Sequence, residues 1–283
     1  MTIKCVGIIG AGLMGNGIAQ VCAAAGLKVT MVDINAAAVE RGLKTIASSL
    51  DRLVKKEKLT AAEKEATLGR IEGGTEYARL KSADLVIEAA TENTSVKLSI
   101  LKELDQLLKP ATVIATNTSS ISITQLAAVC SRPERVLGMH FFNPVPLMQL
   151  LEVIRGLQTS DATHALAMDF ARVIGKTAIT VRNSPGFAVN RILCPMLNEA
   201  IFALQEGVAT AEDIDNGMKL GCNHPIGPLA LADLVGLDTL LAIMRVYSES
   251  FGDPKYRPAP LLVEMVAAGR YGRKSGRGFY TYT

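Results

Sequence analysis

The first two-thirds of the chain alternate short apolar runs with longer segments of mixed polarity. The apolar runs are rich in β-branched residues, which is typical of buried strands, and most of the longer segments have the length of helices. We expect strands at residues 3–9, 28–32, 71–75, 83–90, 112–116, 135–142, 150–154 and 177–181. We expect helices between them at residues 16–25, 94–108, 123–129 and 161–174. This alternation predicts an α/β fold with a doubly wound, largely parallel sheet.

The pattern changes near residue 184, after which only helical segments follow. We expect these helices at residues 189–205, 211–220, 229–250 and 259–268. Several are apolar on more than one face, as residues 229–235 are, and such helices must be covered on two sides. We therefore predict an α/β domain over residues 1–183 and an all-helical domain over residues 184–283. We expect the second domain to form the interface of a homodimer.

A long polar segment, residues 35–70, extends the connection after the second strand. It predicts an inserted pair of helices that breaks near residues 59–60, where Thr60 and Glu63 have the spacing of a capping box. On residue types alone, a solvated helix face is the favoured interpretation, and a face that binds an anionic ligand is the alternative. The basic residues of the pair are Lys44, Arg52, Lys55, Lys56, Lys58 and Lys64.

The first strand leads into three glycines at G-x-G-x-x-G spacing, Gly10, Gly12 and Gly15. In a dinucleotide-binding turn the first glycine allows the tight turn, the second lets the backbone approach a pyrophosphate, and the third lets the helix pack on the strand. Asp33 ends the second strand eighteen residues beyond Gly15, where an acidic residue would meet the adenosine ribose. A carboxylate there favours NAD over NADP, because its charge would repel a 2′-phosphate. The sequence therefore predicts a Rossmann-type NAD site, and a glycine-rich corner that binds nothing is the alternative.

Composition narrows the class of protein further. The 283 residues are 49% hydrophobic and 20% charged, as in a globular protein with a sizeable core. The net charge of +3 argues against broad nucleic-acid binding. The five cysteines are scattered without a C-x-x-C pair, which favours reduced thiols over a disulfide frame or a metal site. With no leader and no apolar stretch long enough to cross a membrane, we expect a cytoplasmic protein.

Polar residues at the ends of three strands are candidates for chemistry, because ligands of open α/β sheets bind beside the carboxyl ends of the strands. They lie at residues 92–93, 117–119 and 139–144. His140 ends one apolar strand, and Glu152 lies inside the next, where an unpaired carboxylate would be costly. If the two strands lie side by side, the side chains form an acid–base pair. The alternative is a core histidine that bonds to a backbone carbonyl.

Motifs along the whole chain resemble those of the short-chain L-3-hydroxyacyl-CoA dehydrogenase family. They are GAGLMG (10–15), TNTSS (116–120), GMHFFNP (138–144), SPGFAVNR (184–191), HPIGP (224–228) with Asp233, GLD (236–238) and GRGFY (276–280). The resemblance implies that His140 is the general acid/base, that Glu152 is its partner, and that Ser119 and Asn190 hydrogen-bond near the reacting carbonyl. It also implies that the basic helical pair, with Arg52 and Lys56 as candidates, receives the CoA phosphates, which replaces the interpretation as a solvated face. The NAD contacts that we expect are Gly10, Gly12, Leu13, Met14, Gly15, Asp33, Glu92, Lys97, Asn117, Ser119, Asn143 and Lys274.

We therefore expect an enzyme that interconverts (S)-3-hydroxyacyl-CoA and 3-oxoacyl-CoA with NAD, with the four-carbon pair as its substrates. One alternative is a dehydrogenase of a free β-hydroxy acid on the same architecture, although those enzymes typically use a catalytic lysine. The other is a non-catalytic dinucleotide-binding protein, which would not need to retain Ser119, His140, Glu152 and Asn190 together.

Overall fold

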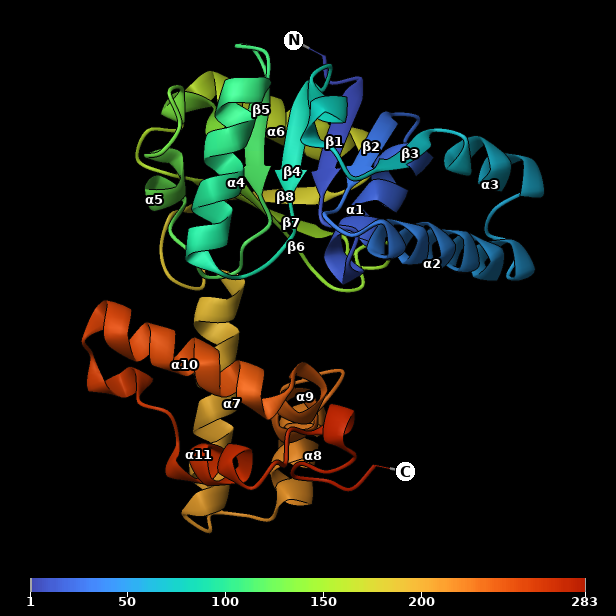
Figure 1. Cartoon of the computed structure of the whole chain (residues 1–283). Helices are drawn as coiled ribbons and strands as arrows, with labels where there is room; N and C mark the ends of the chain where they lie inside the picture. Colours follow the sequence, from blue (N-terminus) through green and yellow to red (C-terminus); the bar gives the residue numbers. More distant parts are fainter. Residues whose placement is uncertain (1, 283) are drawn as a thin grey trace. The chain divides into compact units, whose positions relative to one another are not determined.

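The computed structural model describes residues 2–282. The chain divides into two compact units, Met1–Ser184 and Pro185–Thr283 (Figure 1). The sequence placed this division between residues 183 and 184. The first unit contains the sheet, and the second is helical apart from short bridges near its end.

The first unit is built on one eight-stranded sheet with the order β3-β2-β1-β4-β5-β6-β7-β8. All neighbouring strands run parallel except β6 and β7, so the doubly wound, largely parallel sheet predicted from the sequence is confirmed. The strands are β1 (Cys5–Ile9), β2 (Lys28–Val32), β3 (Ile71–Gly74), β4 (Leu85–Glu88), β5 (Val113–Thr116), β6 (Val136–Phe141), β7 (Leu150–Arg155) and β8 (Thr177–Arg182).

Helices cover both faces of this sheet. Ile8 and Ile9 are adjacent in β1 and belong to different cores, because successive strand residues point to opposite faces. One core includes side chains of α1 (Leu13–Ala24) and α6 (Asp161–Val173). The other includes side chains of α4 (Thr94–Leu107) and α5 (Ile123–Ala127). Short 3₁₀ turns, η1 (Tyr77–Leu80) and η2 (Pro133–Arg135), lie in two of the connections.

The inserted helical pair is present as α2 (Ala36–Lys55) and α3 (Ala61–Leu68), and Figure 1 shows it extending to one side of the sheet. The predicted capping box is confirmed: Thr60 N donates to Glu63 Oε2 at 2.8 Å, and Glu63 N donates to Thr60 Oγ1 at 3.2 Å. Lys64 Nζ donates to Asp51 Oδ1 at 2.8 Å and so ties α3 to α2. The apolar face of α2 packs in the same core as α1.

The second unit contains α7 (Val189–Gln205), α8 (Ala211–Gly221), α9 (Pro228–Val235), α10 (Leu237–Phe251) and α11 (Pro260–Ala267), with short turns η3 (Pro254–Tyr256) and η4 (Arg273–Ser275). The prediction of a single helix over residues 229–250 is wrong, because the chain forms two helices there, α9 and α10, which are divided at Gly236. Gly236 has φ +101°, which breaks the helix and which residues with side chains rarely adopt. The apolar pattern continues through this break and hides it from the sequence.

Two kinds of feature are absent from residues 2–282. No helix in this range is both long and apolar enough to cross a membrane. No group of three or more His, Cys, Asp or Glu side chains in the same range could hold a metal ion.

Candidate active site

In the glycine turn after β1, residues 10–15, the first and third glycines pack closely against the backbone, whereas the second has free space beside it. Gly10 has φ +96°, and a Cβ there would lie 2.6 Å from the Ala89 carbonyl oxygen. A Cβ on Gly15 would lie 1.7 Å from the Gly10 carbonyl oxygen, so only glycine fits. A Cβ on Gly12 would meet nothing within 4 Å. This turn therefore leaves room for a pyrophosphate at Gly12, as the spacing of the motif predicts.

Asp33 lies beside this turn at the end of β2. Its Oδ2 accepts a hydrogen bond from Ala11 N at 2.9 Å, and its Oδ1 accepts one from Asn35 N at 3.1 Å. These bonds hold the carboxylate next to the glycines. No side chain caps the N-terminus of α1 at Gly12, and the exposed N–H groups of a helix start favour an anion. The arrangement fits a dinucleotide with its pyrophosphate on the turn and its ribose near Asp33.

His140 and Glu152 face each other across the antiparallel pair β6–β7. They are direct partners in the strand register, and His140 Nδ1 lies 2.7 Å from Glu152 Oε2. His140 is 7% exposed and Glu152 is fully buried. The two strands thus join the side chains as the sequence predicts. Because a carboxylate only accepts hydrogen bonds, Nδ1 carries the proton, and the basic nitrogen of the neutral ring is Nε2.

His140 lies at the same edge of the sheet as the glycine turn. β6 is parallel to β1 through β5 and β4, so the carboxyl ends of these strands are at one edge. Asn117, which follows β5, accepts a hydrogen bond from Phe141 N through Oδ1 at 2.9 Å. The Phe142 ring lies 4.6 Å from the His140 ring, centroid to centroid. These contacts fix the strand end that carries the histidine.

The loop that carries Ser119, residues 117–120, is hydrogen-bonded to Glu92. Glu92 Oε1 accepts hydrogen bonds from Ser119 N at 2.9 Å and from Ser119 Oγ at 3.0 Å. Thr118 Oγ1 and Ser120 N donate to the same oxygen at 2.7 and 3.2 Å. Two residues expected at the cofactor, Glu92 and Ser119, are therefore brought together. A serine hydroxyl that donates to a carboxylate still has lone pairs that accept a hydrogen bond.

Lys97 is buried beneath this loop. It is 1% exposed, and its Nζ lies 2.6 Å from Glu88 Oε2 and 3.8 Å from Glu92 Oε2. Thr116 Oγ1 also donates to Glu88 Oε2 at 2.8 Å. Glu88 was not among the residues expected from the sequence, although a carboxylate at the end of an apolar strand is the same signal that marked Glu152. A direct NAD contact of Lys97 stays a prediction.

Two further candidates belong to the second unit. Asn190 is the second residue of α7, and Lys274 lies in η4. Lys274 Nζ donates to Asp238 Oδ2 at 2.7 Å. Burial alone would raise the pKa of Asp238, but Lys274 and neighbouring backbone N–H groups lower it overall. The predicted roles of Asn190 and Lys274 stay predictions.

Comparisons with known proteins agree over the full length. Residues 5–184 match the family model for the NAD binding domain of 3-hydroxyacyl-CoA dehydrogenase, and residues 186–282 match the model for its C-terminal domain. The chain is 52% identical to a probable 3-hydroxybutyryl-CoA dehydrogenase of Bacillus subtilis over 282 residues, which covers 100% of this chain and 98% of the relative. It is 52% identical to a 3-hydroxybutyryl-CoA dehydrogenase of Bradyrhizobium diazoefficiens, with 99% and 96% covered. The crystal structure of an (S)-3-hydroxybutyryl-CoA dehydrogenase from Ralstonia eutropha superposes with a TM-score of 0.98 at 64% identity, with both chains fully covered.

Proposed function

Because the chain belongs to the 3-hydroxyacyl-CoA dehydrogenase family, we propose that it interconverts (S)-3-hydroxybutyryl-CoA and acetoacetyl-CoA with NAD(H). The observation that carries this proposal is the buried His140–Glu152 pair at the sheet edge that also holds the glycine turn. An acid–base pair beside a dinucleotide site is what the oxidation of a secondary alcohol requires. A protein that only binds a dinucleotide has no need of this pair.

The glycine turn and Asp33 are the part of the chain that fits the cofactor. NAD⁺ bound there supplies the hydride acceptor, and NADH the hydride donor. The carboxylate of Asp33 accepts hydrogen bonds from ribose hydroxyls and repels a 2′-phosphate, which favours NAD over NADP. Ile34 and Asn35 follow it and offer no guanidinium group for such a phosphate. The other expected cofactor contacts are Leu13, Met14, Glu92, Lys97, Asn117, Ser119, Asn143 and Lys274.

His140 moves the proton. In the oxidative direction, Nε2 takes the proton of the 3-hydroxyl group as the C3–H bond breaks, and in the reductive direction it returns the proton to the 3-oxo oxygen. Glu152 accepts the hydrogen bond of Nδ1, fixes the ring, and stabilises the imidazolium that forms. Ser119 and Asn190 hydrogen-bond the reacting oxygen or the thioester carbonyl.

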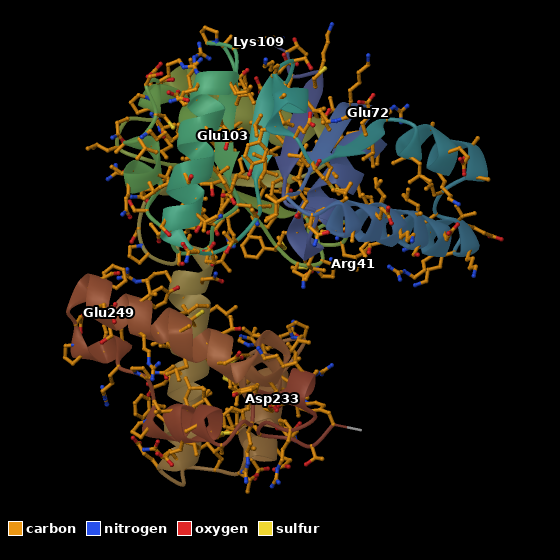
Figure 2. All side chains as sticks on the ribbon, viewed as in Figure 1. Arg41, Glu72, Glu103, Lys109, Asp233 and Glu249 are labelled. Atoms are coloured by element: carbon orange, nitrogen blue, oxygen red, sulfur yellow. The ribbon has the colours of Figure 1, made fainter. Side chains whose placement is uncertain are left out.

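The basic face of α2 supports an acyl-CoA substrate over a free acid. Arg52 and Lys56 are exposed at its C-terminal end, and Figure 2 labels Arg41 on the same helix. Clustered cationic side chains suit the phosphates of a CoA nucleotide, whereas a small free hydroxy acid would have no use for them. Arg52 and Lys56 are therefore the residues that we assign to CoA binding.

The second unit supports a homodimer. Large apolar side chains on its helices are exposed within the chain, among them Ile192 (72%), Leu220 (85%) and Leu234 (53%). Closed two-fold dimers are the commonest assembly that covers such faces. Light scattering at micromolar concentration tests this: a dimer mass is expected, and a monomer mass would contradict it.

The five free cysteines support a cytoplasmic location.

The proposed activity is tested by following NADH absorbance with two substrates, acetoacetyl-CoA and free acetoacetate. We expect saturable oxidation of NADH with acetoacetyl-CoA and little with the free acid. Turnover of acetoacetate alone would replace the acyl-CoA substrate with a free β-keto acid. Binding of NADH without turnover of either substrate would favour a non-catalytic dinucleotide-binding protein.

A further inference from the structure

Lys176 is a buried lysine outside the acid–base pair and the expected cofactor contacts. It lies between α6 and β8 and is 9% exposed. Its Nζ donates to the carbonyl oxygen of Val145 at 2.6 Å and to that of Met148 at 2.7 Å. Both partners are backbone oxygens of the connection between β6 and β7. Burying an ammonium group costs free energy unless it is well hydrogen-bonded, so these two hydrogen bonds are what keeps Lys176 in this position.

The connection that Lys176 holds, residues 142–149, joins the strand of His140 to the strand of Glu152. Asn143, an expected cofactor contact, lies in it. Val145 is 2% exposed and packs against α1, where a Cβ on Gly17 would lie 2.9 Å from the Val145 Cβ. Thr177 N donates to Gln149 O at 2.9 Å and anchors the far end. The connection therefore lies between the helix that follows the glycine turn and the ammonium of Lys176.

The turn inside the connection leaves the two carbonyls to the lysine. Leu147 N and Met148 N both donate to Pro144 O, at 2.9 and 3.0 Å, which forms a turn without using the Val145 or Met148 carbonyl. The ammonium of Lys176 joins these two carbonyls and so closes the turn. Charge-assisted hydrogen bonds are roughly twice as strong as neutral ones, and a buried carbonyl that loses its donor pays the full desolvation cost.

We propose that Lys176 is a positioning residue for hydride transfer, whose ammonium holds the 142–149 connection, and with it Asn143 and the His140 strand end, against α1. This inference rests on the proposed function, since it names how that site is kept in register. Loss of the Lys176 ammonium should therefore change the affinity for NADH and the rate of proton transfer by His140. The basic face of α2, where we assign CoA binding, lies outside the contacts of Lys176.

The test uses the full chain with Lys176→Met, which keeps the aliphatic stem and removes the ammonium, and Lys176→Arg, which restores a buried cation. Lys102→Met, at an exposed position of α4, is the matched control. For each variant we would measure Tm, the Kd for NADH by fluorescence, kcat and KM with acetoacetyl-CoA, and hydrogen exchange of the Leu147 and Met148 amides. We expect the methionine variant to lose roughly tenfold in kcat or in NADH affinity, because both charge-assisted hydrogen bonds are lost and part of their stabilisation acts on the site.

Faster exchange at Leu147 and Met148, an unchanged KM for acetoacetyl-CoA and partial rescue by arginine would support the proposal. A methionine variant that loses only Tm, with the kcat and NADH Kd of the wild type, would overturn it and leave Lys176 a merely structural residue. If that variant does not fold, Lys176→Gln, whose uncharged amide ends one atom short of the position of the ammonium, is measured against the same two outcomes. A wild-type protein that does not reduce acetoacetyl-CoA would contradict the proposed function instead, and the exchange data would still report on the connection.

Discussion

Replacing Glu152 with glutamine would separate the charge of this residue from its shape. Glu152 is fully buried, and its Oε2 lies 2.7 Å from His140 Nδ1. The glutamine side chain in the Glu152→Gln variant could still accept the hydrogen bond of Nδ1 and keep the ring in place. It could not stabilise the imidazolium that forms when the substrate proton is taken. The fold should survive, because the variant also removes the cost of burying a carboxylate.

The size of the effect follows from the geometry of the pair. Opposite charges whose centres lie about 4 Å apart attract by roughly 4 kcal/mol at an effective dielectric constant of about 20. Losing between half and all of this in the transition state lowers kcat by roughly 30- to 1,000-fold, at about 1.4 kcal/mol for each factor of ten. We expect Tm to change by less than about 5 °C.

The assay is steady-state oxidation of NADH with saturating acetoacetyl-CoA, together with the Kd for NADH and Tm. Glu72→Gln is the control, because Glu72 is an exposed glutamate of β3, labelled in Figure 2. The control should keep the wild-type kcat. A Glu152→Gln enzyme within about twofold of the wild-type kcat, well inside one factor of ten, would show that the carboxylate does not stabilise the imidazolium.

Two further predictions concern the ligands. Asp33→Ala should weaken NADH binding and narrow the gap between NADH and NADPH, because the repulsion of the 2′-phosphate is lost; equal kcat/KM for the two cofactors in the wild type would contradict the assignment. Arg52→Glu and Lys56→Glu should each raise KM for acetoacetyl-CoA, more at low salt than at high salt, and leave the NADH Kd unchanged. An acyl-CoA KM that is indifferent to both reversals would remove α2 from the CoA site.

Much of the fold follows from patterns that act over short distances. The β2 strand and the two helices of the insert have the predicted bounds within a few residues, since each depends on a local apolar run or on the capping box of Thr60 and Glu63. The break at Gly236 was missed because leucine and alanine surround it on both sides. A glycine inside a helical pattern does not reveal that its φ is positive.

The candidate site was likewise predicted only in part. The His140–Glu152 pair was accessible from the sequence because a carboxylate in an apolar strand needs a partner, and a short connection brings the strand of His140 beside it. The sequence marked neither Lys97 as the partner of Glu88 nor the 142–149 connection as the partner of Lys176, because each contact joins segments that meet only in the folded chain. In the sequence Lys176 is an ordinary lysine before a strand.

The most direct test of His140 as the general acid/base is the kcat of the His140→Gln variant, measured together with its Kd for NADH. We expect a kcat lower by roughly two to four orders of magnitude, the usual contribution of a general acid/base. The Kd for NADH should hardly change, because the glycine turn and Asp33 remain. Turnover close to that of the wild type would exclude His140 as the general acid/base and make it a buried structural histidine.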